Sequence, residues 1–246
     1  MVRIDEVADG IYRLSSAPEQ SGAIGFNQFL IVDDRPALIH TGTYPMYEAV
    51  RAAVAEVIDP ATLRHVVIGH FEAAECGGMD RFVQAAPRAA LVCSAVGARV
   101  NLAGWNCAGA VRGVEEGAVI DLGRHRLCFL ETPHVHHWDS LMAFEETTAS
   151  LFPADLFIQP RDQPAVVRED LGREMCRFYQ ESGIFASEGP VRRVVDRIEA
   201  LRPEWIHPMH GGSLPAAVVA PYVAALRLEP FAFDGRLMGR RVPGGG

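Results

Sequence analysis

The chain has 246 residues, 49% of them hydrophobic, so it is long enough for one large core and too apolar for a disordered segment. Its formal net charge of −8 argues against a nucleic-acid partner, which would need a basic face. No apolar run approaches the roughly 20 residues that cross a bilayer, so we expect no membrane partner.

The cysteines and the first residues indicate the compartment. Five cysteines make an odd set without a C-x-x-C pair, which argues against a disulfide framework and predicts a reducing, cytoplasmic location. The N-terminal stretch alternates apolar and polar residues and carries acids early, which predicts a strand rather than a signal peptide. Cys76 alone falls in the candidate site, where a small buried residue is favoured over a ligand or redox thiol.

The first half of the chain alternates expected strands and helices. Residues 2–14 predict a strand interrupted by a turn at Asp9-Gly10, and residues 15–25 predict a polar loop. Periodicity predicts further strands over residues 26–32, 37–40, 63–69 and 90–94. It predicts helices over residues 47–58, 79–86 and 94–102.

The second half of the chain continues this alternation. Strands are expected over residues 117–122, 125–131, 141–145, 150–152 and 205–207, and helices over 170–180, 190–201 and 215–227. Residues 105–114 show no clear pattern. Two blocks of strands interleaved with helices predict an α/β (α+β) fold with two sheets packed face to face and helices outside. We expect a single domain over residues 1–246, with a flexible tail over about 240–246.

Residues suited to metal binding follow several of the expected strands. The histidines at strand ends or in loops are His70, His134, His136, His137 and His210. The carboxylates near them are Glu72, Glu75, Asp139 and Asp155. Strand ends are the usual place for ligands on a rigid scaffold, and imidazole with carboxylate suits a small hard cation or a pair of cations.

Each of these signals also has an ordinary explanation. A single H-x-E is common in solvated loops, Asp155 could cap the following segment, and His210 could be a turn residue. Three histidines within four positions could form a surface cluster. Four separate strand-end loops are harder to explain by accident, which favours a metal site.

In their order and spacing, these motifs resemble the metallo-β-lactamase fold and, within it, the flavodiiron and oxygen-binding diiron proteins. The diiron members carry H-x-E-x-D-H where this chain has His70–Glu75 (HFEAAE), whereas the zinc hydrolases of the fold have histidine in the third place. The segment Thr132–Ser140 matches T-P-x-x-H-x-x-D-S, Leu151–Asp155 matches L-F-x-x-D, and Pro208–Gly211 matches P-x-H-G. No flavodoxin domain follows, so a lone diiron domain is the closer comparison.

The resemblance implies an αββα sandwich of two mixed β-sheets and an iron centre. Its first metal position would use His70, Glu72, His136 and the bridging Asp155, while the match leaves His134 and His137 as neighbours. A carboxylate at Glu72 makes the site harder in character, which favours iron over zinc.

The chain departs from the family pattern at the second metal position. Ala74 replaces a ligand aspartate and Glu75 replaces a ligand histidine. The second position would rest on Glu75, Asp155 and His210, completed by water or substrate, and two irons are favoured over a single metal. His40 replaces an aspartate typical of the opening strands.

Two further residues are predicted to act in catalysis. Asp139 is expected to orient a ligand histidine through its other ring nitrogen. Tyr179 lies where the family has a tyrosine near the metals, and a core aromatic residue on a helix is the alternative.

The resemblance implies a non-haem diiron protein that binds or reduces O2 or NO, or uses O2 to oxidise a substrate. The chain has no flavin motif, so a separate electron-donor protein or the substrate would supply electrons, and the family's habit predicts a homodimer. The alternative is a zinc-dependent hydrolase of a thioester, lactone or phosphoester, because the fold hosts many chemistries. Glu72 and Ala74 count against this alternative. A sensor that holds metal and O2 without turnover is a third hypothesis.

Overall fold

Two β-sheets form the centre of the molecule in the computed structural model, which describes residues 2–16, 24–105 and 107–242. The first sheet follows chain order: β1 (Val2–Ala8), β2 (Ile11–Ser16), β3 (Phe26–Ile31), β4 (Ala37–Ile39), β5 (His65–Val67), β6 (Ala90–Ser94) and β7 (Ala110–Val114). The second sheet has the order β13-β12-β11-β10-β9-β8. Its strands are β8 (Val119–Asp121), β9 (Arg126–Glu131), β10 (Leu141–Glu145), β11 (Ser150–Phe152), β12 (Trp205–Ile206) and β13 (Leu214–Pro215).

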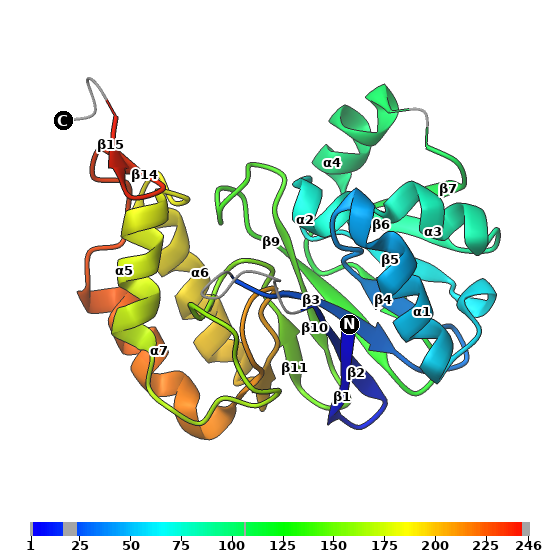
Figure 1. The fold of residues 1–246 in the computed structure, drawn as a ribbon, viewed down its shortest axis with the longest axis horizontal. Coiled ribbons are helices and arrows are strands. Elements are labelled where there is room, and N and C mark those ends of the chain that lie inside the picture. The colour runs from blue at the N-terminus through cyan, green and yellow to red at the C-terminus, as the bar shows by residue number, and fades with distance from the viewer. Residues whose placement is uncertain (1, 17–23, 106, 243–246) are drawn as a thin grey trace.

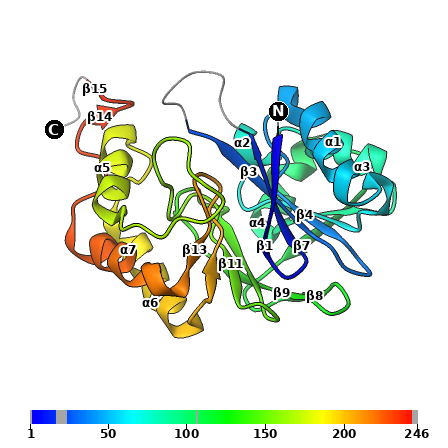
Figure 2. The ribbon, with the colours of Figure 1, turned by 60° about the horizontal axis from the view of Figure 1, so that its bottom comes forward.

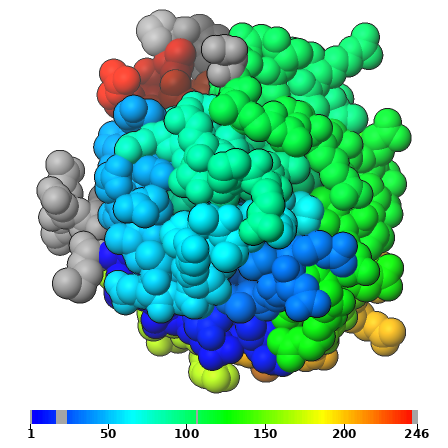
Figure 3. All heavy atoms as spheres, turned by 90° about the vertical axis from the view of Figure 1, so that its right-hand side faces the viewer, coloured from blue at the N-terminus to red at the C-terminus, as the bar shows by residue number. Residues whose placement is uncertain are grey.

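Helices cover the outer faces of both sheets (Figures 1 and 2). Those of the first half are α1 (Tyr47–Val57), α2 (Ala73–Cys76), α3 (Met79–Ala85) and α4 (Ala95–Val100), with 3-10 turns η1 (Tyr44–Met46), η2 (Pro60–Thr62) and η3 (Leu102–Gly104). Those of the second half are α5 (Gly172–Ser182), α6 (Glu188–Leu201) and α7 (Ala216–Leu228). Figure 3, viewed from the side of α1 and α3, shows that residues of the first half of the chain form much of this face of the molecule.

Both sheets mix parallel and antiparallel pairs. In the first sheet β1 to β4 pair antiparallel and β4 to β7 pair parallel. In the second sheet the pair β11–β12 is parallel and the other pairs are antiparallel. The predicted αββα sandwich of two mixed sheets is therefore confirmed.

Apolar side chains fill three layers, because the central strands are buried on both faces. On β3, Phe29 faces the second sheet and belongs to the cluster between the sheets, while Leu30 faces the helical layer beside Val50 of α1. Phe129 and Phe152 reach the inter-sheet layer from the other side. Two packed sheets thus provide a rigid base from which the loops at their ends extend.

Several elements differ from the sequence prediction. Residues 105–114, which showed no clear pattern, contain β7 at the sheet edge, and the short helix α2 lies within the loop that carries Glu75. Arg240 and Arg241, at the start of the predicted tail, form β15, which pairs antiparallel with β14 (Arg236–Leu237). Residues 243–246 of the tail and residues 17–23 of the predicted 15–25 loop lie outside the described residues. Within the described part, no helix has the length and apolarity needed to cross a membrane.

Candidate metal centre

Loops from both sheets bring the predicted ligands together. His70 follows β5 of the first sheet, His136 lies between β9 and β10, Asp155 follows β11, and His210 lies between β12 and β13. The parallel strands β4, β5 and β6 end at the same edge, and the loop after β5 is joined to the second sheet by a hydrogen bond from the Leu141 N–H to the Gly69 carbonyl at 2.7 Å. Ligands far apart in sequence therefore meet at one end of the sandwich.

His70 lies at the centre of this group. Its side chain is buried, and its Nε2 lies 3.3 Å from Asp155 Oδ2, 3.5 Å from Glu75 Oε2 and 3.7 Å from Glu72 Oε2. Neither ring nitrogen has a hydrogen-bond partner among the described residues. One nitrogen facing three carboxylates is an arrangement that a bound cation would balance.

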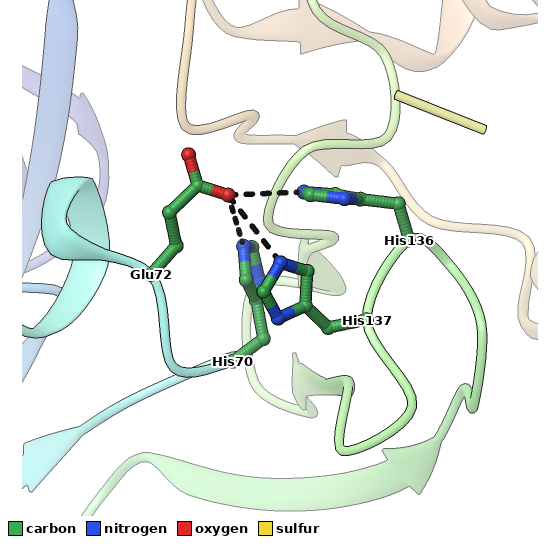
Figure 4. A group of neighbouring side chains, drawn as sticks. All are labelled: His70, Glu72, His136 and His137. Carbon is green, nitrogen blue, oxygen red and sulfur yellow. Dashed lines mark ion pairs between the residues drawn. The ribbon is translucent and has the colours of Figure 1, made fainter. Parts of the chain in front are cut away.

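Glu72 faces three imidazoles. Its Oε2 lies 3.5 Å from His136 Nε2 and 3.5 Å from His137 Nε2, in addition to the contact with His70. Figure 4 shows the three rings turned toward this oxygen, with His70 from one loop and the two neighbouring histidines from the other. His137, which the motif match left outside the ligand set, therefore belongs to the cluster.

Asp155 presents its two oxygens to different histidines. Oδ2 lies 3.0 Å from His136 Nε2 and 3.3 Å from His70 Nε2, while Oδ1 lies 3.4 Å from His210 Nε2. The two oxygens of Asp155 therefore face histidines on different sides of the carboxylate. Oδ1 is buried without a hydrogen-bond partner among the described residues.

Glu75 is fully buried and both of its oxygens lack a hydrogen-bond partner within the described part of the chain. Its ion-pair contact is with His70, and no contact between Glu75 and His210 within 4.0 Å occurs among the described residues. The carboxylate that replaces a family histidine thus lies on the His70 side of the centre.

Charge interactions shift the pKa values of these groups in opposite directions. Burial raises the pKa of Glu75 well above its usual range, and the nearby Asp155 adds to this effect. Burial also opposes ionisation of Asp155, but its contacts with His136 and His70 outweigh this effect and hold the pKa of Asp155 well below the ordinary value.

The remaining shifts follow the same logic. The contact with His137, and to a smaller extent the contact with His70, holds the pKa of Glu72 far below its ordinary value. Burial would lower the pKa of His70, but Glu75, Asp155 and Glu72 together hold it well above the usual value.

The donor set fits a metal ion on two grounds. Several buried polar atoms of His70, Glu75 and Asp155 are unpaired among the described residues, and such atoms are costly unless something satisfies them. Imidazole nitrogens and carboxylate oxygens are also the donors that iron and similar divalent ions take. His70 forms one group with Glu72, His136 and His137 and another with Glu75 and Asp155, each with donor atoms within 4.8 Å of one another.

The loop that carries His210 is fixed by buried polar residues of the first sheet. Asn27 donates through Nδ2 to the carbonyls of Pro208 (2.9 Å) and Gly211 (2.7 Å), and Arg13 donates to the same Gly211 carbonyl at 2.9 Å. His210 Nδ1 lies 2.7 Å from the Gly25 carbonyl, so this nitrogen carries the proton and Nε2 is free to bind a metal.

Arg13 also donates through Nε to Asn27 Oδ1 at 2.9 Å, which joins the two residues into one unit. Burial lowers the pKa of Arg13 to about 10, with Asp5 opposing this effect at the edge of the sheet. This Arg13–Asn27 clamp was not found from the sequence, because neither residue lies in a ligand motif.

The two residues predicted to be catalytic lie beside the centre. The Tyr179 hydroxyl is fully buried, donates to the backbone carbonyl of Asp155 at 3.0 Å and accepts from the Ile158 N–H at 2.9 Å. Asp139 Oδ1 lies 3.7 Å from His137 Nδ1. Each therefore contacts a residue of the cluster from behind: Tyr179 the Asp155 loop, and Asp139 the ring of His137.

Three other candidate residues contribute no donor atom to the cluster, because they are exposed to solvent or buried against other side chains. His134 is exposed, although its backbone N–H donates to the His137 carbonyl at 2.7 Å. His40 is buried with Nδ1 3.2 Å from Met209 Sδ, and burial together with His70 lowers its pKa to about 3. Burial raises the pKa of the Cys76 thiol to about 12, which fits the small buried residue favoured from the sequence.

The chain is similar to known proteins over most of its length. Residues 24–211 match the model of the ODP family beta lactamase. A nitric oxide reductase of Moorella thermoacetica is 30% identical over 139 residues, which is 54% of this chain and 34% of the relative.

Solved structures share the fold. The rubredoxin oxygen:oxidoreductase of Desulfovibrio gigas superposes with a TM-score of 0.80 at 20% identity, over 91% of this chain and 60% of that one. A fragment of a putative diflavin flavoprotein of Nostoc sp. PCC 7120 gives 0.78 at 20% identity, over 93% and 98% of the two chains. The chain spans less than half the length of the curated relatives it matches.

Proposed function

Because the chain belongs to the ODP family of beta-lactamase-fold proteins, we propose that it is a non-haem iron protein that binds or reduces O2 or NO. The observation that carries this proposal is the buried cluster in which His70 faces three carboxylates and Glu72 faces three imidazoles. The name of the Moorella relative, nitric oxide reductase, and that of the Desulfovibrio protein, rubredoxin oxygen:oxidoreductase, give the two diatomic ligands.

The choice of iron follows from the donor set. The centre has three carboxylates, Glu72, Glu75 and Asp155, which is more than zinc sites built on histidine and cysteine contain. Carboxylate oxygens suit a hard redox ion such as iron. Iron bound here would supply electrons to the diatomic molecule. Asp155, with its two oxygens directed to His136 and His210, would bridge two ions, and the second ion would take His210 with Glu75 or water.

Neighbouring residues would keep the ligands in place. Tyr179 holds the backbone at Asp155, and the Arg13–Asn27 clamp holds the loop of His210. Glu72, about half exposed, lies on the solvent side of the buried His70, so it borders the direction from which a small molecule would enter.

Electron supply and assembly complete the proposal. A separate electron-donor protein would reduce the iron, as the word rubredoxin in the names of relatives suggests. We further propose that residues 1–246 act as one domain, that the protein works in the cytoplasm, and that it forms a homodimer.

The test is the metal content and reactivity of protein purified without oxygen. We expect iron at one to two ions per chain, and a change in the optical spectrum when O2 or NO is admitted. His70→Ala is expected to lose most of the iron. Bound zinc with no response to either gas, together with hydrolysis of esters or thioesters, would support the zinc hydrolase instead.

A further inference from the structure

We propose that His137 is a metal ligand and that one ion is held by His70, His136, His137 and Glu72. This inference rests on the proposed metal centre and goes beyond the family motif, which selects only the first of the two adjacent histidines. The site so defined is a position with three imidazoles and one carboxylate. It would fill before the position that includes His210.

Distances support a common ion. Glu72 Oε2 lies 3.5–3.7 Å from the Nε2 atoms of His70, His136 and His137. Donor atoms bound to one ion at 2.0–2.1 Å in a tetrahedron lie about 3.4 Å apart. All four donor atoms also lie within 4.8 Å of one another. His137 Nε2 is as close to Glu72 as the motif histidine His136 is.

The three rings pack closely around one carboxylate oxygen. The rings of His70, His136 and His137 lie with centroids 4.6–4.8 Å apart, and the Nε2 atom of each faces Glu72 Oε2. Three ring nitrogens directed at one carboxylate oxygen can bind a common cation through their lone pairs.

The surroundings of His137 resemble those of a ligand rather than of a surface side chain. Its side chain is one third exposed, and Asp139 Oδ1 lies 3.7 Å from the nitrogen that faces away from Glu72. Asp139 is itself held, because Oδ2 accepts from the Phe71 N–H and from Asn101 Nδ2. A carboxylate behind a ligand histidine is the usual orienting partner in metal sites.

The loop fixes the backbone at this histidine as well. The His137 N–H donates to Ser140 Oγ at 3.0 Å, and its carbonyl accepts from the His134 N–H at 2.7 Å. Ser94 Oγ donates to the Asp139 carbonyl at 2.8 Å, which ties the loop to the first sheet. His137 is thus directed inward by contacts on both sides, whereas His134 in the same loop points to solvent.

The two metal positions are then unequal. The position at Glu72 has four donors of its own, with Asp155 Oδ2 beside it. The other position has His210 and Asp155 Oδ1 facing each other, while Glu75 lies nearer His70. More donors give tighter binding, so we expect two distinct affinities and a first ion at the Glu72 position.

The experiment is an anaerobic titration of metal-free protein with Co²⁺, followed by its visible absorption, and with Fe²⁺, followed by bound metal after dialysis. The wild type, His137→Ala, His137→Gln and the matched control His134→Ala are compared, with circular dichroism to verify folding. We expect both His137 variants to weaken binding of the first ion at least about tenfold and to change the Co²⁺ spectrum. His134→Ala is expected to match the wild type.

The outcomes separate this inference from the proposed function. First-ion affinity and a Co²⁺ spectrum unchanged in both His137 variants would overturn the inference while leaving an iron centre intact. A wild type that binds neither ion would overturn the centre itself. His210→Ala provides the reverse case: it is expected to remove the weaker ion and leave the first, and loss of the first ion instead would contradict the assignment.

Discussion

The two loops that meet at the centre have changed in opposite directions relative to the family pattern. The segment after β5 has lost a ligand at Ala74 and exchanged a histidine for Glu75, whereas the loop after β9 presents His137 beside His136. Both loops lie on the same rigid sandwich. On the proposed assignment, one donor has moved from the loop after β5 to the loop after β9 while the scaffold remains unchanged.

The largest expected effect on metal content comes from replacing His70, which contacts side chains of several loops. His70→Ala removes the nitrogen that faces Glu72, Glu75 and Asp155, so Glu75 would lose the histidine with which it pairs, and Glu72 and Asp155 would each lose one of theirs. We expect loss of most bound iron at both positions, measured as iron per chain after anaerobic dialysis. Retention of wild-type iron would place the metal elsewhere, and His134→Ala is the matched control.

A second variant tests the segment that lost ligands. Glu75→Gln keeps the size of the side chain and removes its charge, so an ion that needs this oxygen would be held more weakly. We expect the metal count to fall toward one per chain, with the first ion retained at the Glu72 position. A count equal to that of the wild type would mean that Glu75 binds no ion.

A third variant tests the support of the His210 loop. Asn27→Leu removes the donors to the Pro208 and Gly211 carbonyls and leaves Arg13 Nε without its acceptor. Losing buried hydrogen bonds of this kind costs about 2–4 kcal/mol, so the midpoint of urea unfolding should fall. The second ion should be released before the first, and Arg3→Ala, which removes an exposed ion pair with Asp162, should change little.

The smallest effect is expected at Tyr179. Tyr179→Phe removes the hydroxyl between the Asp155 carbonyl and the Ile158 N–H, at a cost of about 1–3 kcal/mol in unfolding free energy. Because the hydroxyl contacts backbone rather than a donor atom of the cluster, the metal count should stay unchanged. A normal stability with a lost reaction toward O2 or NO would instead indicate a direct catalytic role.

The layers of the fold were predictable because they follow from local patterns. The strands at residues 90–94, 141–145 and 150–152 have the predicted bounds, since each is a short apolar run between polar turns. Strand β7 was missed because four of its five residues are exposed, which leaves no apolar pattern in the sequence. The strand is recognised only by its pairing with β6. The hairpin β14–β15 was missed because its two-residue strands carry no periodicity.

Only those site residues that lie in recognised motifs were predictable from the sequence. The side chains of His70, Glu72, His136 and Asp155, which were predicted as ligands of one metal position, lie close together. His137 was passed over because one motif position selects one histidine, whereas ring directions depend on the loop. The sequence signal that could have found it is the H-x-H-H spacing followed by Asp139.

The central claim concerns where the first ion binds. The most direct test is a crystal structure of protein loaded without oxygen with one equivalent of Fe²⁺, with anomalous scattering measured at the iron edge. The account predicts one iron peak among the side chains of Glu72, His70, His136 and His137. A first peak between Asp155 and His210, with His137 turned away, would contradict it.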